Sequence, residues 1–170
     1  SNSVNCSFLV NGRPQAQITA PDDSTVFLFG DTINFTSTAS DDQNVLTYNW
    51  YSDVDGLLYS GNSSSFSIDN LVRGEHEITL YVTDYYGYNS TEKTIDIRIN
   101  HVPTINLTGP ESNAQVPDSE DGTVTFWWEA SDVDSDSLTF KVYLGESEDN
   151  LSLLGTTTAN NWEKENLDTD

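Results

Sequence analysis

The sequence repeats itself with a period of about ninety residues, and this repeat constrains the fold more than any other feature. Residues 14–21 read PQAQITAP, and residues 103–110 read PTINLTGP. The other corresponding pairs are DTINFTSTASDD (31–42) with GTVTFWWEASDV (122–133), VLTYNWY (45–51) with SLTFKVY (137–143), and DNL (69–71) with ENL (165–167). The offset grows from 89 to 96 residues along the chain, as short loop insertions would produce. A repeat of this length predicts two small domains of the same fold in tandem.

Apolar and polar residues alternate in the segments where regular structure is expected. A period of two is typical of antiparallel strands with one buried face, and no run of ten residues has the period of an amphipathic helix. The sequence therefore predicts an all-β chain of tandem Ig-like β-sandwiches, with Trp50 in the first core. The alternating apolar residues are Ile33 and Phe35; Ile78, Leu80 and Val82; Ile95, Ile97 and Ile99; and Val124 and Phe126.

The repeat also predicts the domain boundaries. Residues 13–100 contain a complete sandwich. Residues 101–170 contain a second sandwich that lacks its last two strands, because nothing after ENL corresponds to VRGEHEITLYVTDYYGYNSTEKTIDIRIN. Residues 1–12 resemble the final strand of a preceding module. In this alignment Cys6, Phe8 and Val10 take the places of Ile95, Ile97 and Ile99.

An incomplete sandwich has an open apolar face and unpaired strand edges. One explanation is that the sequence ends at an arbitrary fragment boundary, or at the limit of the ordered part of a larger chain. The other is strand donation, in which residues 4–10 of one subunit complete the second module of another and build a filament. The second explanation makes Cys6, Phe8 and Val10 candidate assembly residues.

Several motifs of the first copy carry a family resemblance: FGDTINFTSTASDD, WYSDVDG, LLYSG and GEHEITLYVTDYYG. The run from Phe29 to Asn100 that contains them resembles the PKD-like Ig modules of archaeal and bacterial surface proteins, although it departs from the WDFGDG pattern of PKD domains. ASDVDSDSLTFKVYLGES in the second copy resembles a fibronectin type III-like repeat from the same kind of protein. The resemblance implies extracellular spacing, adhesion or assembly, and no conserved catalytic residues.

The charge of the chain excludes several partners. Asp and Glu number 28 against 6 Lys and Arg, which gives a net charge of −22. Such a chain repels nucleic acids and anionic membrane surfaces, and it has no apolar stretch long enough to span a membrane. A salt-rich habitat and an ordinary acidic secreted protein both explain the acidity. Cys6 is the single cysteine, so the chain has no internal disulfide.

Six Asn-x-Ser/Thr sequons favour an exported and glycosylated protein of the cell surface. Each one is a weak signal, because a chain rich in Ser, Thr and Asn contains sequons by chance. The candidate glycosylation sites are Asn5, Asn34, Asn62, Asn89, Asn106 and Asn150.

Three acidic turns offer the hard oxygen ligands that calcium requires. No EF-hand is present, because Ser137 and Tyr143 stand where that loop needs Gly and Glu. Calcium is therefore considered only at simpler sites between strands, and no other cofactor is expected. The alternative is that these side chains cap tight turns. The candidate ligands are Asp41 and Asp42; Asp53 and Asp55; and Asp132, Asp134 and Asp136.

Aromatic side chains are candidate contacts for a partner protein or a glycan. Trp127 and Trp128 are adjacent in a strand and must face opposite sides, so one belongs to the core, and Trp128 is taken as the exposed member. The segment from Tyr85 to Tyr88 predicts an aromatic hairpin tip, whose tyrosines either contact a partner or pack on the end of the module. The candidate contacts are Tyr85, Tyr86, Tyr88 and Trp128.

The sequence contains no arrangement of residues that indicates catalysis. His76 and His101 are interpreted as isolated surface or linker residues, and Cys6 has no partner base. The leading hypothesis is a non-catalytic structural or adhesive segment of an extracellular cell-surface or filament-forming protein. The alternative is a pair of spacer or carbohydrate-binding modules in a secreted hydrolase. An enzyme in its own right is the third and least favoured class.

Overall fold

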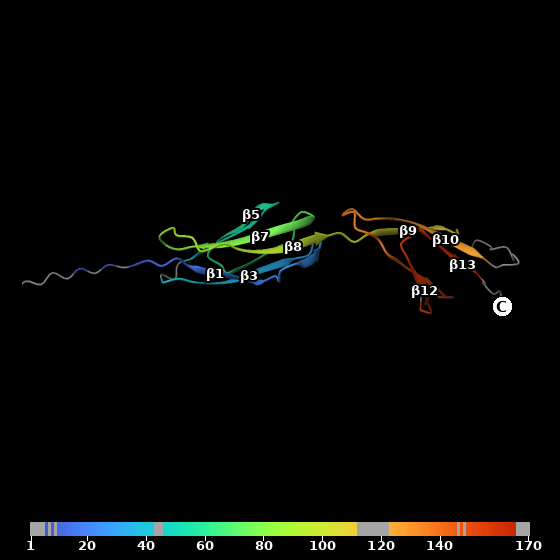
Figure 1. Cartoon of the computed structure of the whole chain (residues 1–170), viewed down its shortest axis with the longest axis horizontal. Helices are drawn as coiled ribbons and strands as arrows, with labels where there is room; N and C mark the ends of the chain where they lie inside the picture. Colours follow the sequence, from blue (N-terminus) through green and yellow to red (C-terminus); the bar gives the residue numbers. More distant parts are fainter. Residues whose placement is uncertain are drawn as a thin grey trace, which may run out of the picture. The chain divides into compact units, whose positions relative to one another are not determined.

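The computed structural model describes residues 6, 8, 10–42, 46–111, 123–145, 147 and 149–165. The chain divides into two compact units, residues 1–100 and 101–170, which we call the first and the second module. All regular structure in the described ranges is β-strand (Figure 1). No helix with the length and apolarity of a membrane span occurs among these residues. The prediction of an all-β chain of tandem Ig-like sandwiches is confirmed.

The first module is a sandwich of two sheets that lie face to face (Figure 1). One sheet has the strand order β1-β3-β6 and the other β2-β8-β7-β4-β5. Neighbouring strands are antiparallel except β2 and β8, which pair in parallel. The strands are β1 (Gln15–Ala20), β2 (Thr25–Leu28), β3 (Ile33–Ser40), β4 (Thr47–Ser52), β5 (Gly56–Gly61), β6 (Ser65–Ile68), β7 (Gly74–Thr83) and β8 (Lys93–Asn100).

The alternating residues form the core between these sheets. Trp50 on β4 is fully buried, and its ring centroid lies 5.4 Å from that of Phe35 and 5.7 Å from that of Phe66. Phe66 stacks on both Phe35 and Tyr59, with centroid separations of 5.0 and 4.9 Å. A shift of one residue in strand register would turn this set to solvent, so the core specifies the register. The other buried apolar residues on β3, β7 and β8 are Ile33, Ile78, Leu80, Val82, Ile97 and Ile99.

The second module repeats five of these strands in the same order. Its β10 pairs with β9 and β13, as β3 pairs with β1 and β6, and its β11 pairs with β12, as β4 pairs with β5. The described part of this module contains no counterparts of β2, β7 and β8. The strands are β9 (Thr104–Gly109), β10 (Val124–Ser131), β11 (Phe140–Leu144), β12 (Ser152–Thr157) and β13 (Asn161–Lys164).

The two modules fill the space between their sheets with different residues. Trp128 on β10 stands where the first module has Ser37, and Val142 on β11 stands where it has Trp50. The large ring therefore comes from the opposite sheet in the second module, where Trp128 meets Phe140 at 5.3 Å between ring centroids.

A second exchange involves a glycine. Tyr59 stacks on Phe66 in the first module, and the same positions in the second module hold Gly155 and Trp162. A β-carbon at Gly155 would overlap the Trp162 ring, so only glycine allows the larger ring to lie against this strand.

Candidate functional site

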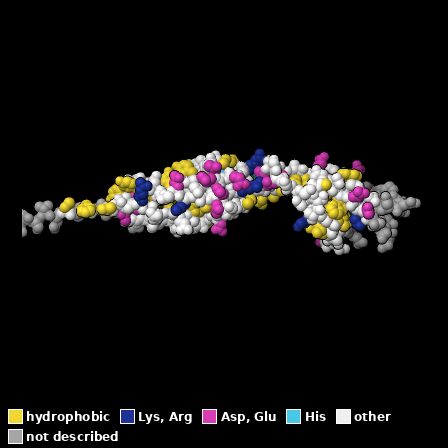
Figure 2. Space-filling model, viewed as in Figure 1, with side chains coloured by type: hydrophobic (Ala, Val, Ile, Leu, Met, Phe, Trp, Pro, Cys, Tyr) yellow, Lys and Arg dark blue, Asp and Glu magenta, His cyan; other side chains and the backbone are white. Residues whose placement is uncertain are grey.

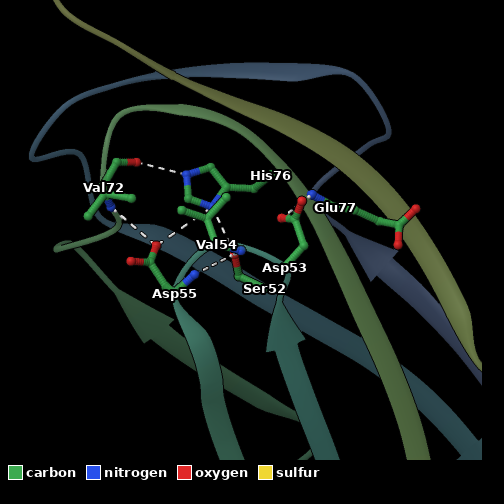
Figure 3. A network of polar contacts seen from close by, with 7 residues as sticks. All are labelled: Ser52, Asp53, Val54, Asp55, Val72, His76 and Glu77. Atoms are coloured by element: carbon green, nitrogen blue, oxygen red, sulfur yellow. Dashed lines mark hydrogen bonds and ion pairs between the residues drawn. The ribbon is translucent and has the colours of Figure 1, made fainter.

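A network of polar contacts in the first module surrounds His76 on β7 (Figure 3). The side chain of His76 is 1% exposed, and its Nε2 lies 2.7 Å from the carbonyl oxygen of Val72. A carbonyl can only accept, so Nε2 carries the proton and Nδ1 accepts from the Ser52 hydroxyl at 2.8 Å. Ser52 Oγ in turn accepts from the backbone N–H groups of Val54 and Asp55, at 3.1 and 3.2 Å. We call these contacts the Ser52–His76 network.

The Ser52–His76 network has the residue types of a nucleophile and its base, but the geometry gives them a structural role. Both side chains are buried, and both ring nitrogens of His76 already have partners inside the protein. Asp55 Oδ2 lies 3.6 Å from the same Nδ1 that accepts the serine proton, so it does not orient the other nitrogen as a catalytic carboxylate does. The network therefore closes the β4–β5 turn and the segment before β7.

The interpretation of His76 as a surface residue is wrong. His76 continues the alternation of Ile78, Leu80 and Val82 along β7, so its side chain points into the sandwich. That alternation is visible in the sequence and indicates the burial directly. The Ser52 partner lies 24 residues earlier in the chain, and only the pairing of β4 with β7 brings the two together.

Three of the four carboxylates of the first module that were predicted as calcium ligands accept backbone hydrogen bonds. Asp53 Oδ1 accepts from the N–H of Glu77 at 2.9 Å, and Asp55 Oδ2 accepts from the N–H of Val72 at 3.2 Å. Asp42 Oδ2 accepts from the N–H of Gly12 at 3.2 Å. Asp41 and Asp42 follow β3, whereas Asp53 and Asp55 follow β4, so the two pairs occupy separate loops.

The acidic turn of the second module follows β10 and has a similar arrangement. Asp132 Oδ1 accepts from the N–H of Asp134 at 2.7 Å, and Asp134 Oδ2 accepts from the N–H of His101 at 2.5 Å. Ser135 has a φ of 63° in this turn, and Asp136 is half-buried. Asp and Ser at these positions are typical of tight turns. Across the described ranges, no group of three His, Cys, Asp or Glu side chains converges as metal ligands would.

We expect Asp134→Ala to lower the melting temperature of the chain equally in calcium and in chelator, because the variant loses the hydrogen bond from His101 N–H. A hydrogen bond of this kind contributes about 1 kcal/mol. Thermal denaturation followed by circular dichroism measures both conditions. A rise in melting temperature with calcium that Asp134→Ala abolishes would instead establish calcium binding at residues 132–136.

The tyrosine loop, residues 84–88, lies in the connection between β7 and β8 and is organised around Asp84. Asp84 Oδ1 accepts from the N–H groups of Tyr86 and Tyr88 at 2.9 and 2.8 Å, and Oδ2 accepts from Asn11 Nδ2 at 2.6 Å. The three tyrosines point to solvent, with exposed fractions of 70% for Tyr85, 51% for Tyr86 and 53% for Tyr88. A buried carboxylate thus binds the backbone beneath the exposed tyrosines.

These contacts shift the ionisation of Asp84. Burial by itself raises the pKa of the Asp84 carboxyl. The hydrogen bonds from Asn11 and from the backbone of Tyr88, Tyr86 and Gly87 outweigh burial and hold the pKa of Asp84 below its ordinary value. The hydrogen bonds of the loop therefore stabilise the ionised form of Asp84.

We expect acidification to remove the stability that Asp84 supplies. A carboxyl whose pKa is lowered by folding contributes stability that is fully present above its unfolded pKa of about 3.9 and is lost as the pH falls through the folded value. Asp84→Asn should therefore lower the melting temperature at neutral pH, and its difference from wild type should shrink in strong acid. The exposed Asp69→Asn serves as control. A difference that stays constant from neutral pH into strong acid would contradict this role.

The predicted glycosylation sites lie on the surface wherever they fall in described residues. Asn34, Asn62, Asn89, Asn106 and Asn150 are exposed. Asn5 lies outside the described residues. Two of the exposed amides also accept hydrogen bonds, Asn34 from Ser67 and Asn89 from Thr83.

The choice of Trp128 as the exposed tryptophan is wrong. Trp128 is 6% exposed and faces the interior of the second module, whereas Trp127 is 51% exposed. Adjacent strand residues face opposite sides, but which of them faces inward depends on the strand register. Here Val124 and Trp128 share the inner face of β10.

The candidate assembly residues at the N-terminus are exposed. Phe8 is 86% exposed, Val10 is 74% exposed, and Cys6 is a free exposed thiol. Residues 1–5, 7 and 9 of the same segment lie outside the described residues.

Comparison with known proteins shows what the first module is similar to. Fibronectin(III)-like modules of CbhA from Clostridium thermocellum align at 18% identity with a TM-score of 0.45, over 50% of this chain and 94% of theirs. The PKD domain of an M14-like peptidase from a Thermoplasmatales archaeon aligns at 19% identity with a TM-score of 0.44, over 53% and 98%. No match was found among curated proteins. Residues 14–80 match the bacterial Ig domain family, so the expected resemblance to bacterial Ig-like modules is confirmed for the first module.

Proposed function

We propose that the chain is a non-catalytic structural or adhesive segment of an extracellular cell-surface or filament-forming protein. The observation that carries the proposal is the way the first module uses its buried polar groups. Ser52, His76 and Asp84 are buried, and each makes hydrogen bonds that stabilise turns of the sandwich. A catalytic site needs such groups to remain available to a substrate. Bacterial Ig, PKD and fibronectin type III modules are typically non-catalytic.

The surface supports an extracellular location. Acidic side chains are spread over the visible face of the first module and are not gathered in one patch (Figure 2). With a net charge of −22, this surface keeps the chain soluble and repels anionic polymers. The exposed asparagines of five sequons are accessible to a glycosylating enzyme. Modules of these families are typical of extracellular proteins.

The tyrosine loop is the candidate contact for a partner protein or a surface glycan. Tyr85 and Tyr86 meet edge to face with ring centroids 5.2 Å apart, and Asp84 fixes the backbone beneath them. Preorganised aromatic side chains bind at low entropic cost, because little freedom remains to be lost.

The same loop favours the alternative function, a spacer or carbohydrate-binding module of a secreted hydrolase. Exposed tyrosines stack on sugar rings as readily as they contact proteins. A tandem of sandwiches would also serve as a spacer between the catalytic and the binding domain of such an enzyme. The two functions differ in what the loop binds and in which domains the complete gene encodes.

A glycan array tests the proposal against this alternative. For a structural or adhesive segment that contacts proteins, we expect no glycan binding by the purified chain. Glycan binding that Tyr86→Ala abolishes and Tyr143→Ala preserves would favour the alternative; Tyr143 is a 49% exposed tyrosine of the second module. The complete reading frame gives a second criterion. Further Ig-like modules support the proposal, and a catalytic domain contradicts it.

A further inference from the structure

We propose that the tyrosine loop binds a cationic side chain, arginine or lysine, of a partner protein. The proposal deepens the adhesive role proposed above and rests on it, because it names the class of partner that the same loop takes. Two observations carry it. Tyr85, Tyr86 and Tyr88 each expose more than half of their surface, and the carboxylate that binds their backbone, Asp84, has no cationic partner among the described residues.

Asp84 supplies a negative charge directly beneath the backbone of the loop. Its side chain is 6% exposed, and its hydrogen-bond donors are backbone N–H groups of the loop and the amide of Asn11. These donors are neutral, so they stabilise the carboxylate without cancelling its charge. Protein surrounds part of this site in place of water, which strengthens the attraction between the carboxylate and a cation docked on the loop. The loop thus has an uncompensated charge that a positive ligand would balance.

The rings of the loop suit the same ligand. The face of an aromatic ring is its negative region, so it attracts ammonium and guanidinium groups, and the flat guanidinium group also stacks on it. The planes of Tyr85 and Tyr86 meet at 83°, and the exposure of both residues leaves ring surface open to a ligand. The rings and the carboxylate therefore attract a cation together.

The contacts of Asp84 favour a cation over a sugar. A site for a neutral, polar ligand needs side chains that form hydrogen bonds with the ligand. Both oxygens of Asp84 already accept hydrogen bonds from within the first module, and little of the side chain is exposed. Asp84 therefore acts on a ligand through its charge, and only a cationic ligand benefits from that charge.

The charge of the whole chain identifies the partner further. A net charge of −22 accelerates the approach of a positively charged protein and opposes the approach of a second copy of this chain. Attraction over such a distance selects no particular site, so the specificity must come from the tyrosines. The partner we infer is a different protein that exposes arginine or lysine.

A peptide titration of the full chain tests the proposal. The probes are capped peptides of Gly-Arg repeats and of Gly-citrulline repeats, because citrulline has the shape of arginine without its charge. Amide resonances are followed by NMR at physiological salt, which screens contacts with the rest of the acidic surface. We expect the arginine peptide to shift the resonances of residues 84–88, and its own side-chain resonances to move upfield in the ring currents. The citrulline peptide should cause no such shifts.

Matched variants separate the rings from the overall charge. Tyr86→Ala keeps the net charge and the backbone N–H that Asp84 binds, so the variant should fold. A chain with both Tyr85→Ala and Tyr86→Ala should bind the arginine peptide at least about fivefold more weakly. Tyr86→Phe keeps the ring and should bind as wild type does. Tyr143→Ala, which removes a 49% exposed tyrosine of the second module, should also leave the affinity unchanged.

Three results of this titration would overturn the proposal. They are equal binding of the two peptides, shifts that spread over both modules without concentrating on residues 84–88, and an unchanged affinity of the double variant. Glycan-array binding that Tyr86→Ala abolishes would assign the loop to a sugar instead. The reading-frame criterion of the proposed function does not depend on this titration, so the two proposals fail separately.

Discussion

Replacing Trp50 by alanine is expected to lower the free energy of unfolding of the first module by about 3–5 kcal/mol. The indole ring is fully buried and makes ring contacts with Phe35 and Phe66, which belong to the opposite sheet. Alanine would leave a cavity between the two sheets. Backbone hydrogen bonds hold the strands of each sheet in place, so the sheets would close the cavity only in part. Urea denaturation followed by circular dichroism measures the change.

The control for this variant is Leu57→Ala on β5, the strand beside β4. Leu57 is 57% exposed, and its truncation should change the free energy of unfolding by less than about 0.5 kcal/mol. Equal losses for Trp50→Ala and Leu57→Ala would mean that the ring cluster does not hold the sheets together.

Ser52→Ala is expected to cost the first module at least about 2 kcal/mol, although it removes a single oxygen atom. The Ser52 hydroxyl serves three partners, since it donates to His76 Nδ1 and accepts from the N–H groups of Val54 and Asp55. The variant leaves these three groups buried or partly buried without a hydrogen-bond partner. A buried polar group without a partner lowers stability by more than a satisfied hydrogen bond raises it. The same urea titration measures this loss.

Ser67→Ala is the matched control for the Ser52 variant. Ser67 lies on β6, is exposed, and donates one hydrogen bond to Asn34. Its loss should stay within about 0.5 kcal/mol. If the two serine variants were equally stable, the Ser52–His76 network would not contribute to folding.

Much of the architecture could be predicted from local pattern. The alternation of Ile78, Leu80 and Val82 specifies a strand with one buried face because side chains of a strand point to opposite sides in turn. Strand β2 escaped prediction, since Thr25–Leu28 is short and pairs in parallel with β8, far away in the sequence. Parallel pairing has no hairpin turn to reveal it.

The polar sites were less predictable for a related reason. The turns after β3, β4 and β10 are rich in aspartate, and such a composition is typical both of a calcium site and of a turn that its own side chains cap. The two differ in where the oxygens point, which depends on backbone donors such as Glu77 N–H and Val72 N–H in other segments. The backbone of the tyrosine loop is likewise bound by Asp84, whose contact with Asn11 spans 73 residues of sequence.

The sequence by itself determined that the chain folds into two related β-sandwiches, because its repeat and its alternation are properties of residues close together in the chain. The tertiary structure alone decided which tryptophan of the pair is buried, that His76 belongs to the interior, and that Ile105 and Leu107 lie uncovered. Each of these depends on strand register or on the presence of a facing strand. Register and facing partners are set by contacts between segments far apart in the sequence, and local pattern carries no record of them.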